Sequence, residues 1–335
     1  MAKQSITNLQ TSSLEELLFI IDNYSLSYRS TLGLPKTFSF GTEVEFEKAP
    51  ITKVYKQMPN FPSWNLGIDT TVRERIGVQQ CGGEITSSTL IDTPKTWLEL
   101  ASVLEMLKQE NAKVTGKAGS HIHLGAHVLE MNPNYLINFI KLWMAYEKVI
   151  YRFSYGEDLS ARPRILDVAP PVTPVLYPLI RDEKSLPDEF PRLLRLIKNS
   201  TGKKSGVNFL NVFYIETIPF EEKNTVEIRT PNGTLDPHIW QTNINFFAHL
   251  LLAATNDNLD TEYLDTKLEK LKEEDFSFTD YNQLYLKEAL ELSNMIFTTA
   301  EDKLSFLSIY TKHFQTEEER PKILKKEPIN WQNLK

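Results

Sequence analysis

Residues 41–47 read GTEVEFE and place acidic residues at every second position, with apolar residues between them. The acidic residues are Glu43, Glu45 and Glu47. Because successive side chains of a β-strand point to opposite faces, this alternation predicts a strand with its carboxylates on one face and its apolar side chains in a core. Like charges on one face repel one another, so we expect a positive group to lie against these carboxylates.

The same alternation of polar and apolar residues recurs in three later segments of the chain. Its polar members are Glu84, the pair His121 and His123, and the pair Glu227 and Arg229. If the four segments are neighbouring strands, one face of a sheet gathers carboxylates, imidazoles and a guanidinium, while helices cover the other face.

The helices expected on that other face share one start signal. A residue that can cap a helix precedes a proline at Thr93–Pro94, Asn132–Pro133 and Asp236–Pro237, and an apolar periodic run follows each pair. Proline suits the first helical position because a backbone N–H would have no partner there. The predicted helices cover residues 95–109, 134–153 and 238–254.

The chain divides by composition into a main part and an appended part. Residues 1–255 hold all the strand patterns, and we expect them to form one catalytic domain. Within it, residues 155–205 are rich in proline and arginine with weak periodicity, which predicts an irregular insertion with one helix near residues 189–199. Residues 256–335 are charged and helical in pattern, and we expect a helical extension packed on the domain.

Composition limits the classes of partner. The chain has 37 Lys and Arg against 44 Asp and Glu, a net charge of −7, which argues against a general nucleic-acid or anionic-membrane binder. A single cysteine, Cys81, excludes an internal disulfide and favours a reducing compartment. The sequence shows no signal-peptide pattern, and its longest apolar run, 246–254, is too short to span a bilayer. We therefore expect a cytoplasmic protein, and the pattern does not indicate an oligomeric state.

The sheet face expected to gather carboxylates, imidazoles and a guanidinium has the composition of a divalent-metal site. Carboxylates with one or two imidazoles favour Mg²⁺ or Mn²⁺ over structural zinc, because hard cations prefer oxygen ligands. Since Mg²⁺ commonly takes phosphate oxygens as well, Arg229 beside the carboxylates suggests a metal–nucleotide site. The sequence contains neither a P-loop nor a GxGxxG motif, so metal, arginine and backbone groups would have to hold the phosphates.

Simpler interpretations exist for each motif alone. An ExE pattern is common on solvated strands, His121 and His123 could be a packed or surface pair, and Glu227 and Arg229 could form only an ion pair. The occurrence of all these motifs on matching faces favours the functional interpretation.

Five segments in this order resemble the amidoligase family, a branch of the carboxylate–amine ligases that includes glutamine synthetase and glutamate–cysteine ligase. They are FGTEVEFE, GGEITSS, GSHIHLG, VNFLN and VEIRTPNGTLDP, within about residues 38–255. The resemblance implies a glutamine synthetase-like α+β fold, in which a curved, mainly antiparallel sheet carries helices on its outer face. It also implies ATP and two or three divalent metal ions, Mg²⁺ or Mn²⁺, on the inner face.

The resemblance also implies roles for individual residues. The implied metal ligands are Glu43, Glu45, Glu84, His121 and Glu227. His123 would face the phosphates, Arg229 would contact the transferring phosphoryl group, and Arg229 and Glu45 would be catalytic. Asn208, Arg162 and Arg164 would bind the nucleotide or a substrate carboxylate.

The implied activity is an ATP-dependent carboxylate–amine ligase that forms an amide bond through an acyl phosphate. Its substrates would be a small-molecule or peptide acid and an amine, and the carboxylate that deprotonates the amine stays open, with Glu47 one candidate. The alternatives are a metal-dependent amide hydrolase that uses His121 and His123, and a binding module without catalysis.

Overall fold

A computed structural model of the chain describes residues 13–154, 165–181, 185–213, 224–271 and 285–311. Its centre is one sheet in which every strand pair is antiparallel, with the path β2-β4-β1-β6-β8-β7; β3 pairs with β4 and β5 with β1. The strands are β1 (Ser39–Pro50), β2 (Trp64–Gly67), β3 (Glu74–Ile76), β4 (Gln79–Ser87), β5 (Leu90–Ile91), β6 (Ser120–Gly125), β7 (Val207–Asn208) and β8 (Thr225–Ile228).

The apolar residues of the alternating patterns all face the protein core. Val44, Phe46, Ile85, Ile122 and Val226 are each at most 1% exposed. They come from β1, β4, β6 and β8, so the strands align one apolar face, as the alternation predicts. Burial of this face fixes the register of the strands, because a slip by one residue would turn every apolar side chain toward the opposite face.

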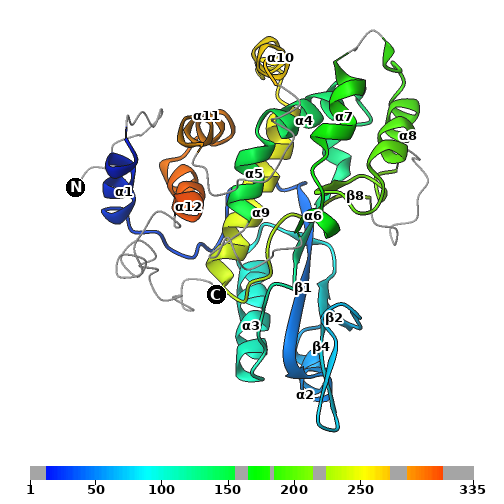
Figure 1. The fold of residues 1–335 in the computed structure, drawn as a ribbon. Coiled ribbons are helices and arrows are strands. Elements are labelled where there is room, and N and C mark those ends of the chain that lie inside the picture. Colours follow the sequence, from blue (N-terminus) through cyan, green and yellow to red (C-terminus); the bar gives the residue numbers. More distant parts are fainter. Residues whose placement is uncertain (1–12, 155–164, 182–184, 214–223, 272–284, 312–335) are drawn as a thin grey trace.

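Helices cover this apolar face. In Figure 1, α3 and α9 run along one side of β1, and α9 also contacts α4. The helices before α9 are α1 (Leu14–Asp22), α2 (Ile51–Gln57), α3 (Pro94–Gln109), α4 (Pro133–Ala145), α5 (Glu147–Ser154), α6 (Ile165–Val168), α7 (Thr173–Ile180) and α8 (Phe190–Thr201). They are followed by α9 (Pro237–Ala254), α10 (Thr261–Glu269), α11 (Leu286–Ile296) and α12 (Ala300–Thr311). The α+β class with an antiparallel sheet is therefore confirmed.

The three predicted helix starts are confirmed, with prolines at the first helical positions of α3, α4 and α9. The side chains of Thr93, Asn132 and Asp236 each accept a hydrogen bond from a backbone N–H of the first turn. The long helix predicted over 134–153 is instead two helices, α4 and α5, separated at Tyr146, whose φ of −125° is not helical.

The buried carboxylate of Glu147 lies directly after this break. Its oxygens accept hydrogen bonds from Trp143 Nε1 at 2.9 Å, Val172 N at 2.7 Å and Thr173 N at 3.0 Å. Burial raises the pKa of Glu147, although these hydrogen bonds oppose the shift. The carboxylate thereby attaches the start of α7 to α5, so the insertion is tied to the helical layer.

The insertion is more helical than the weak periodicity indicates. The predicted helix is α8, and α6 and α7 are two further helices that the sequence pattern does not predict. Prolines lie inside or next to these short helices, and they obscure the apolar period. Residues 155–164, which include Arg162 and Arg164, lie outside the described residues.

The C-terminal helices pack on the rest of the protein through both apolar and polar contacts. Helix α10 contacts α4, and α11 and α12 contact α9. Glu291 of α11 accepts hydrogen bonds from Tyr263 at 2.8 Å and Lys267 at 2.9 Å, both on α10, and also from Tyr146. One hydrophobic core runs from the sheet into these helices. Among the described residues, no helix has both the length and the apolar character needed to cross a membrane.

Candidate active site

The polar residues of the four alternating patterns meet on the face of the sheet opposite the core. Glu43 of β1 lies opposite His121 of β6, and Glu45 of β1 lies opposite Glu84 of β4. On the other side of β6, His123 pairs with Glu227, which in turn pairs with Asn208 of β7. Directly opposed residues point to the same face, so these residues form one surface, which we call the polar face.

Glu43 lies at the centre of the polar face, between the two histidines. Its Oε2 is 3.1 Å from His121 Nδ1, and its Oε1 is 2.8 Å from His123 Nε2. Burial tends to raise the pKa of Glu43, but hydrogen bonds from the two imidazoles act more strongly together and hold the pKa well below its ordinary range. The carboxylate is therefore ionised and is a strong candidate for binding cations.

His121 presents a buried nitrogen toward the carboxylates. The side chain is 6% exposed, and its Nε2 has no hydrogen-bond partner in the described part of the chain. The nearest ion-pair contact of Nε2 is Oε1 of Glu45 at 3.7 Å, while Oε2 of Glu45 accepts a 2.6 Å hydrogen bond from Gly119 N. A buried imidazole nitrogen without a partner costs free energy, which coordination to a cation between these groups would recover.

Glu227 anchors the other end of the polar face. Its Oε2 accepts a hydrogen bond from Asn208 Nδ2 at 2.7 Å, and its Oε1 is paired with Arg229 Nη1. Next to it, His123 Nδ1 lies 3.1 Å from the hydroxyl of Thr225. This contact orients the imidazole so that its Nε2 meets Glu43. A buried carboxylate, a half-buried guanidinium and a buried amide are thus held in one place.

Asp69 is a candidate site residue that the sequence patterns do not reveal. It lies in the loop 68–73 between β2 and β3, and its carboxylate is close to those of Glu45 and Glu84. Thr71 donates two hydrogen bonds to Oδ1 of Asp69, at 2.6 Å from the backbone N and 2.7 Å from the hydroxyl, and these bonds fix the turn. A loop residue has no strand period, so alternation could not identify it.

A glycine allows the loop to pass close to β4. Gly82 has a φ of +79°, and a Cβ atom there would lie only 2.3 Å from the carbonyl oxygen of Val72. Any other residue at this position would push the loop away from the strand. The Gly82–Gly83 pair before Glu84 was thus the available sequence signal for a backbone crossing at this point.

Three groups of potential ligands can be drawn from the polar face and the loop, in each of which one atom per residue lies within 4.8 Å of the others. The groups are Glu43, Glu84 and His121; Glu43, His123 and Glu227; and Glu45, Asp69 and Glu84. Carboxylate oxygens with at most one imidazole are donors that Mg²⁺ and Mn²⁺ accept. With the partnerless nitrogen of His121, the donor set fits divalent cations.

Glu47 and Cys81 lie outside the three ligand groups. Glu47 is 3% exposed, and its Oε1 accepts hydrogen bonds from Thr115, at 3.0 Å from the backbone N and 2.6 Å from the hydroxyl. Its carboxylate is therefore engaged with the segment before β6 rather than with the three ligand groups. Cys81 is buried in β4, and burial raises the pKa of its thiol, as expected for an unreactive cysteine.

The protein thus carries a largely buried, carboxylate-rich site on one face of an antiparallel sheet. Residues 37–251, more than half of the chain, match the model of the family described as "Putative amidoligase enzyme". The protein belongs to this family, whose activity is of the ligase type. The family resemblance of its motifs is thereby confirmed.

Comparisons with curated proteins and with solved structures add little to the family assignment. None of the curated proteins matches the chain. Among solved structures, a match is the "Crystal structure of novel glutamine synthase homolog", with a TM-score of 0.35 and 13% sequence identity. The match covers 83% of this chain and 66% of that homologue, so the chain spans less than two thirds of its length.

Proposed function

We propose that the protein is an ATP-dependent carboxylate–amine ligase that forms an amide bond through an acyl phosphate. The observation that carries this proposal is the polar face, where Glu43, Glu84, His121 and Glu227 come together from four strands. Within it, Nε2 of His121 has no hydrogen-bond partner among the described residues. Membership of the amidoligase family supports the same reaction class. The substrates would be a small-molecule or peptide acid and an amine.

The residues that would hold the metal ions are the three ligand groups. Glu43 belongs to two of them, and Glu84 also belongs to two, so neighbouring positions share ligands. Mg²⁺ or Mn²⁺ bound there would offset the negative charge of ATP phosphates, which the carboxylates alone would repel. Asp69 enters the proposal as a ligand that the loop supplies.

Arg229 is the proposed catalytic cation. Glu227, which neighbours His123 and Asn208, pairs with one arm of the Arg229 guanidinium. In the first step, an oxygen of the substrate carboxylate attacks the γ-phosphorus of ATP, and ADP leaves. Arg229 would stabilise the charge on the transferring phosphoryl group, with His123 and Asn208 as further nucleotide contacts.

Glu45 is the proposed catalytic carboxylate of the second step. The amine nitrogen attacks the acyl carbon, the C–O bond to phosphate breaks, and inorganic phosphate leaves. Because an ammonium has no lone pair, the amine must lose a proton to a nearby base. The hydrogen bond from Gly119 orients Glu45 so that its other oxygen is held near His121, inside the polar face. Glu47, engaged with Thr115, is less suited to this role.

The organisation and location of the protein complete the proposal. We assign residues 1–255 to a catalytic domain that includes the insertion 155–205, and residues 256–335 to a helical extension. We also propose a cytoplasmic enzyme without nucleic-acid or membrane partners, in line with the net charge of −7. Arg162 and Arg164 remain proposed contacts for the nucleotide or a substrate carboxylate.

The direct test is ADP release from Mg²⁺-ATP, screened over pairs of amino acids and short peptides, with mass spectrometry of each product. We expect one pair to give ADP, phosphate and an amide in equal amounts. Glu43→Gln and Glu227→Gln should lose this turnover, while Glu105→Gln, an exposed carboxylate of α3, should retain it. Full turnover in both site variants would exclude the polar face as the active site. Stoichiometric zinc with amide hydrolysis in the absence of ATP would instead establish the hydrolase alternative.

A further inference from the structure

Asn208 lies between two buried apolar residues at the end of the edge strand β7. Val207 and Phe209 are at most 1% exposed, so their side chains enter the core. Because side chains alternate along a strand, that of Asn208 points to the opposite side, where Glu227 of β8 is its direct partner. Asn208 is itself only 2% exposed, so its amide needs hydrogen-bond partners within the protein.

The amide of Asn208 is held in one orientation. The backbone N–H of Leu210 donates a 2.9 Å hydrogen bond to Oδ1 of Asn208, a turn that asparagine commonly forms with the backbone two residues on. Nδ2 of Asn208 donates a 2.7 Å hydrogen bond to Oε2 of Glu227. A flipped amide would set N–H against N–H and oxygen against carboxylate, and it would lose both hydrogen bonds. The turn with Leu210 therefore directs an N–H donor at Glu227.

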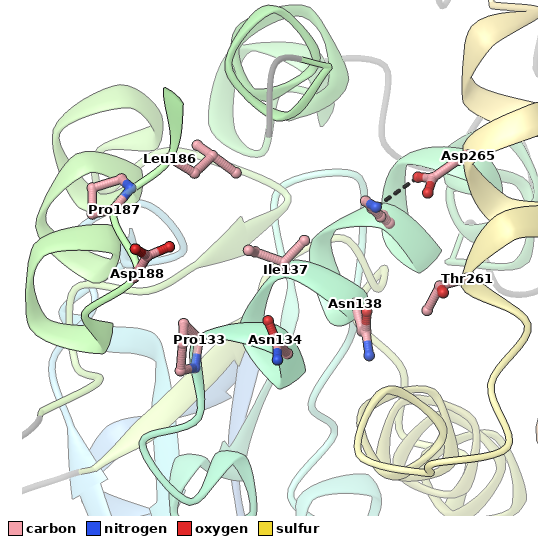
Figure 2. Close-up of a pocket in the computed structure, with 10 residues that line it drawn as sticks. Pro133, Asn134, Ile137, Asn138, Leu186, Pro187, Asp188, Thr261 and Asp265 are labelled. Carbon is pink, nitrogen blue, oxygen red and sulfur yellow. Dashed lines mark ion pairs between the residues drawn. The ribbon is translucent and has the colours of Figure 1, made fainter. Parts of the chain in front are cut away.

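The backbone of this turn is anchored to the helical layer. The ring of Phe209 packs against that of Phe139 of α4, with 6.2 Å between the ring centroids. Residues two apart do not share a face of a helix, so Ile137 points away from this contact. With Asn134 and Asn138, Ile137 lines a cavity of about 620 Å³ beside α4 (Figure 2). The turn is thus attached to the buried face of α4, and the cavity takes no part in it.

Two donors hold the carboxylate of Glu227. Asn208 donates to its Oε2 and Arg229 to its Oε1, and the side chain is only 7% exposed. One oxygen of this carboxylate lies within 4.8 Å of potential ligand atoms of Glu43 and His123. The last side-chain torsion of glutamate is soft, so a carboxylate without its donor at Oε2 could turn away from these atoms. The hydrogen bond from Asn208 restricts this rotation.

We propose that Asn208 is a positioning residue for metal binding, whose amide holds Glu227 in the orientation in which Glu43, His123 and Glu227 can bind one divalent cation. This role is separate from the nucleotide contact proposed for the same side chain. The inference rests on the proposed metal binding of the polar face and is independent of ligase turnover. Hydrogen-bond partners of metal ligands typically contribute about 10- to 100-fold to affinity, so metal binding alone should report the loss of the amide.

Calorimetry with Mn²⁺ tests the proposal on metal-free protein, without nucleotide or substrates. Asn208→Ser keeps a hydroxyl that can accept a hydrogen bond from the backbone two residues on, but it lacks the amide that reaches Glu227. We expect the dissociation constant of one class of Mn²⁺ sites to rise by about 10- to 100-fold. The group of Glu45, Asp69 and Glu84 contains no residue of the Glu227 group, so its affinity should not change. This second class of sites reports whether the sheet is intact.

Three further variants show whether Asn208 acts through Glu227. Glu227→Gln should weaken the same class of Mn²⁺ sites, and the double variant should bind as Glu227→Gln alone does. Asn256→Ser is the matched control and should bind as the wild type does, because Oδ1 of Asn256 accepts the backbone N–H of Asn258 at 2.9 Å in a similar turn outside the sheet.

Three results would overturn the inference and leave the proposed function standing. They are wild-type Mn²⁺ affinity in Asn208→Ser, an equal loss at both classes of sites, and a further loss in the double variant. A wild-type protein that binds no Mn²⁺ would overturn both the inference and the metal ions of the proposed function.

Discussion

Divalent metal should stabilise the folded protein, and Glu43→Gln should remove most of that effect. Glu43 contributes to two of the three ligand groups, more than any histidine of the polar face. Its replacement by glutamine keeps the shape of the side chain but removes the negative charge that attracts a cation. The change therefore weakens two neighbouring metal positions at once.

The size of the effect follows from linkage between binding and folding. At a Mg²⁺ concentration about one hundred times the dissociation constant, binding adds about 2.7 kcal/mol to the free energy of unfolding. Changes to groups that only support metal ligands weaken affinity by about 10- to 100-fold, so loss of a direct ligand should reach at least the upper figure. At the same Mg²⁺ concentration, Glu43→Gln would then gain only about 0.4 kcal/mol.

Urea unfolding of metal-stripped protein, with and without Mg²⁺, measures both values. In a parallel thermal unfolding experiment, Mg²⁺ should raise the melting temperature of the wild type by about 5 °C, since each kcal/mol shifts the melting temperature of a chain of this size by about 2 °C. Glu105→Gln on the exposed side of α3 serves as the matched charge control and should respond as the wild type does. Equal stabilisation of Glu43→Gln and the wild type would refute metal binding at Glu43, whatever the catalytic result.

Three further predictions concern charge and burial. Arg229→Lys should lower kcat by about a hundredfold or more, because the point charge of lysine cannot replace the planar guanidinium that a carboxylate holds in place. Steady-state ADP release at the wild-type rate would contradict this prediction. Burial tends to raise the pKa of Glu291, but hydrogen bonds from two tyrosines and a lysine lower this pKa overall. The ionised Glu291 therefore stabilises the folded protein fully above its unfolded-state pKa, and this stabilisation is lost as the pH falls through its folded-state pKa. Glu291→Gln should therefore flatten the fall in unfolding free energy between about pH 5 and pH 3, and an unchanged slope would argue against the role of this cluster. Glu147→Ala should cost about 3–5 kcal/mol in urea unfolding, because it leaves one indole N–H and two backbone N–H groups buried without an acceptor, and a loss below about 1 kcal/mol would disprove that account.

The strand period explains why much of the fold and of the polar face could be predicted. The polar residues of the strands alternate with or adjoin apolar residues that have to enter the core, so burial of the apolar residues determined the face of the polar ones. These polar residues are Glu43, Glu45, Glu84, His121 and Glu227. The capping residue before a proline marked the starts of α3, α4 and α9 for an equally local reason. The assignment of chemical roles to these residues stays a prediction.

The features that were not predicted depend on tertiary contacts. Asp69 reaches the carboxylates because the loop crosses β4 at Gly82, and nothing in its own neighbourhood of sequence marks it as a ligand. The division between α4 and α5 at Tyr146 interrupts a continuous apolar period, and Glu147 after it binds backbone groups some 25 residues away in sequence. A local pattern carries no information about such partners.

The central position of β1 links correct folding of the sheet to the presence of the site. β1 pairs with β4 on one side and β6 on the other, so a shift of β1 by one residue would carry Glu43 and Glu45 into the apolar layer and bring Val44 out of it. Such a molecule would bury carboxylates without partners, which costs free energy, so the shifted register is strongly disfavoured. The register that buries Val44 in the core is therefore the same register that places Glu43 and Glu45 on the polar face.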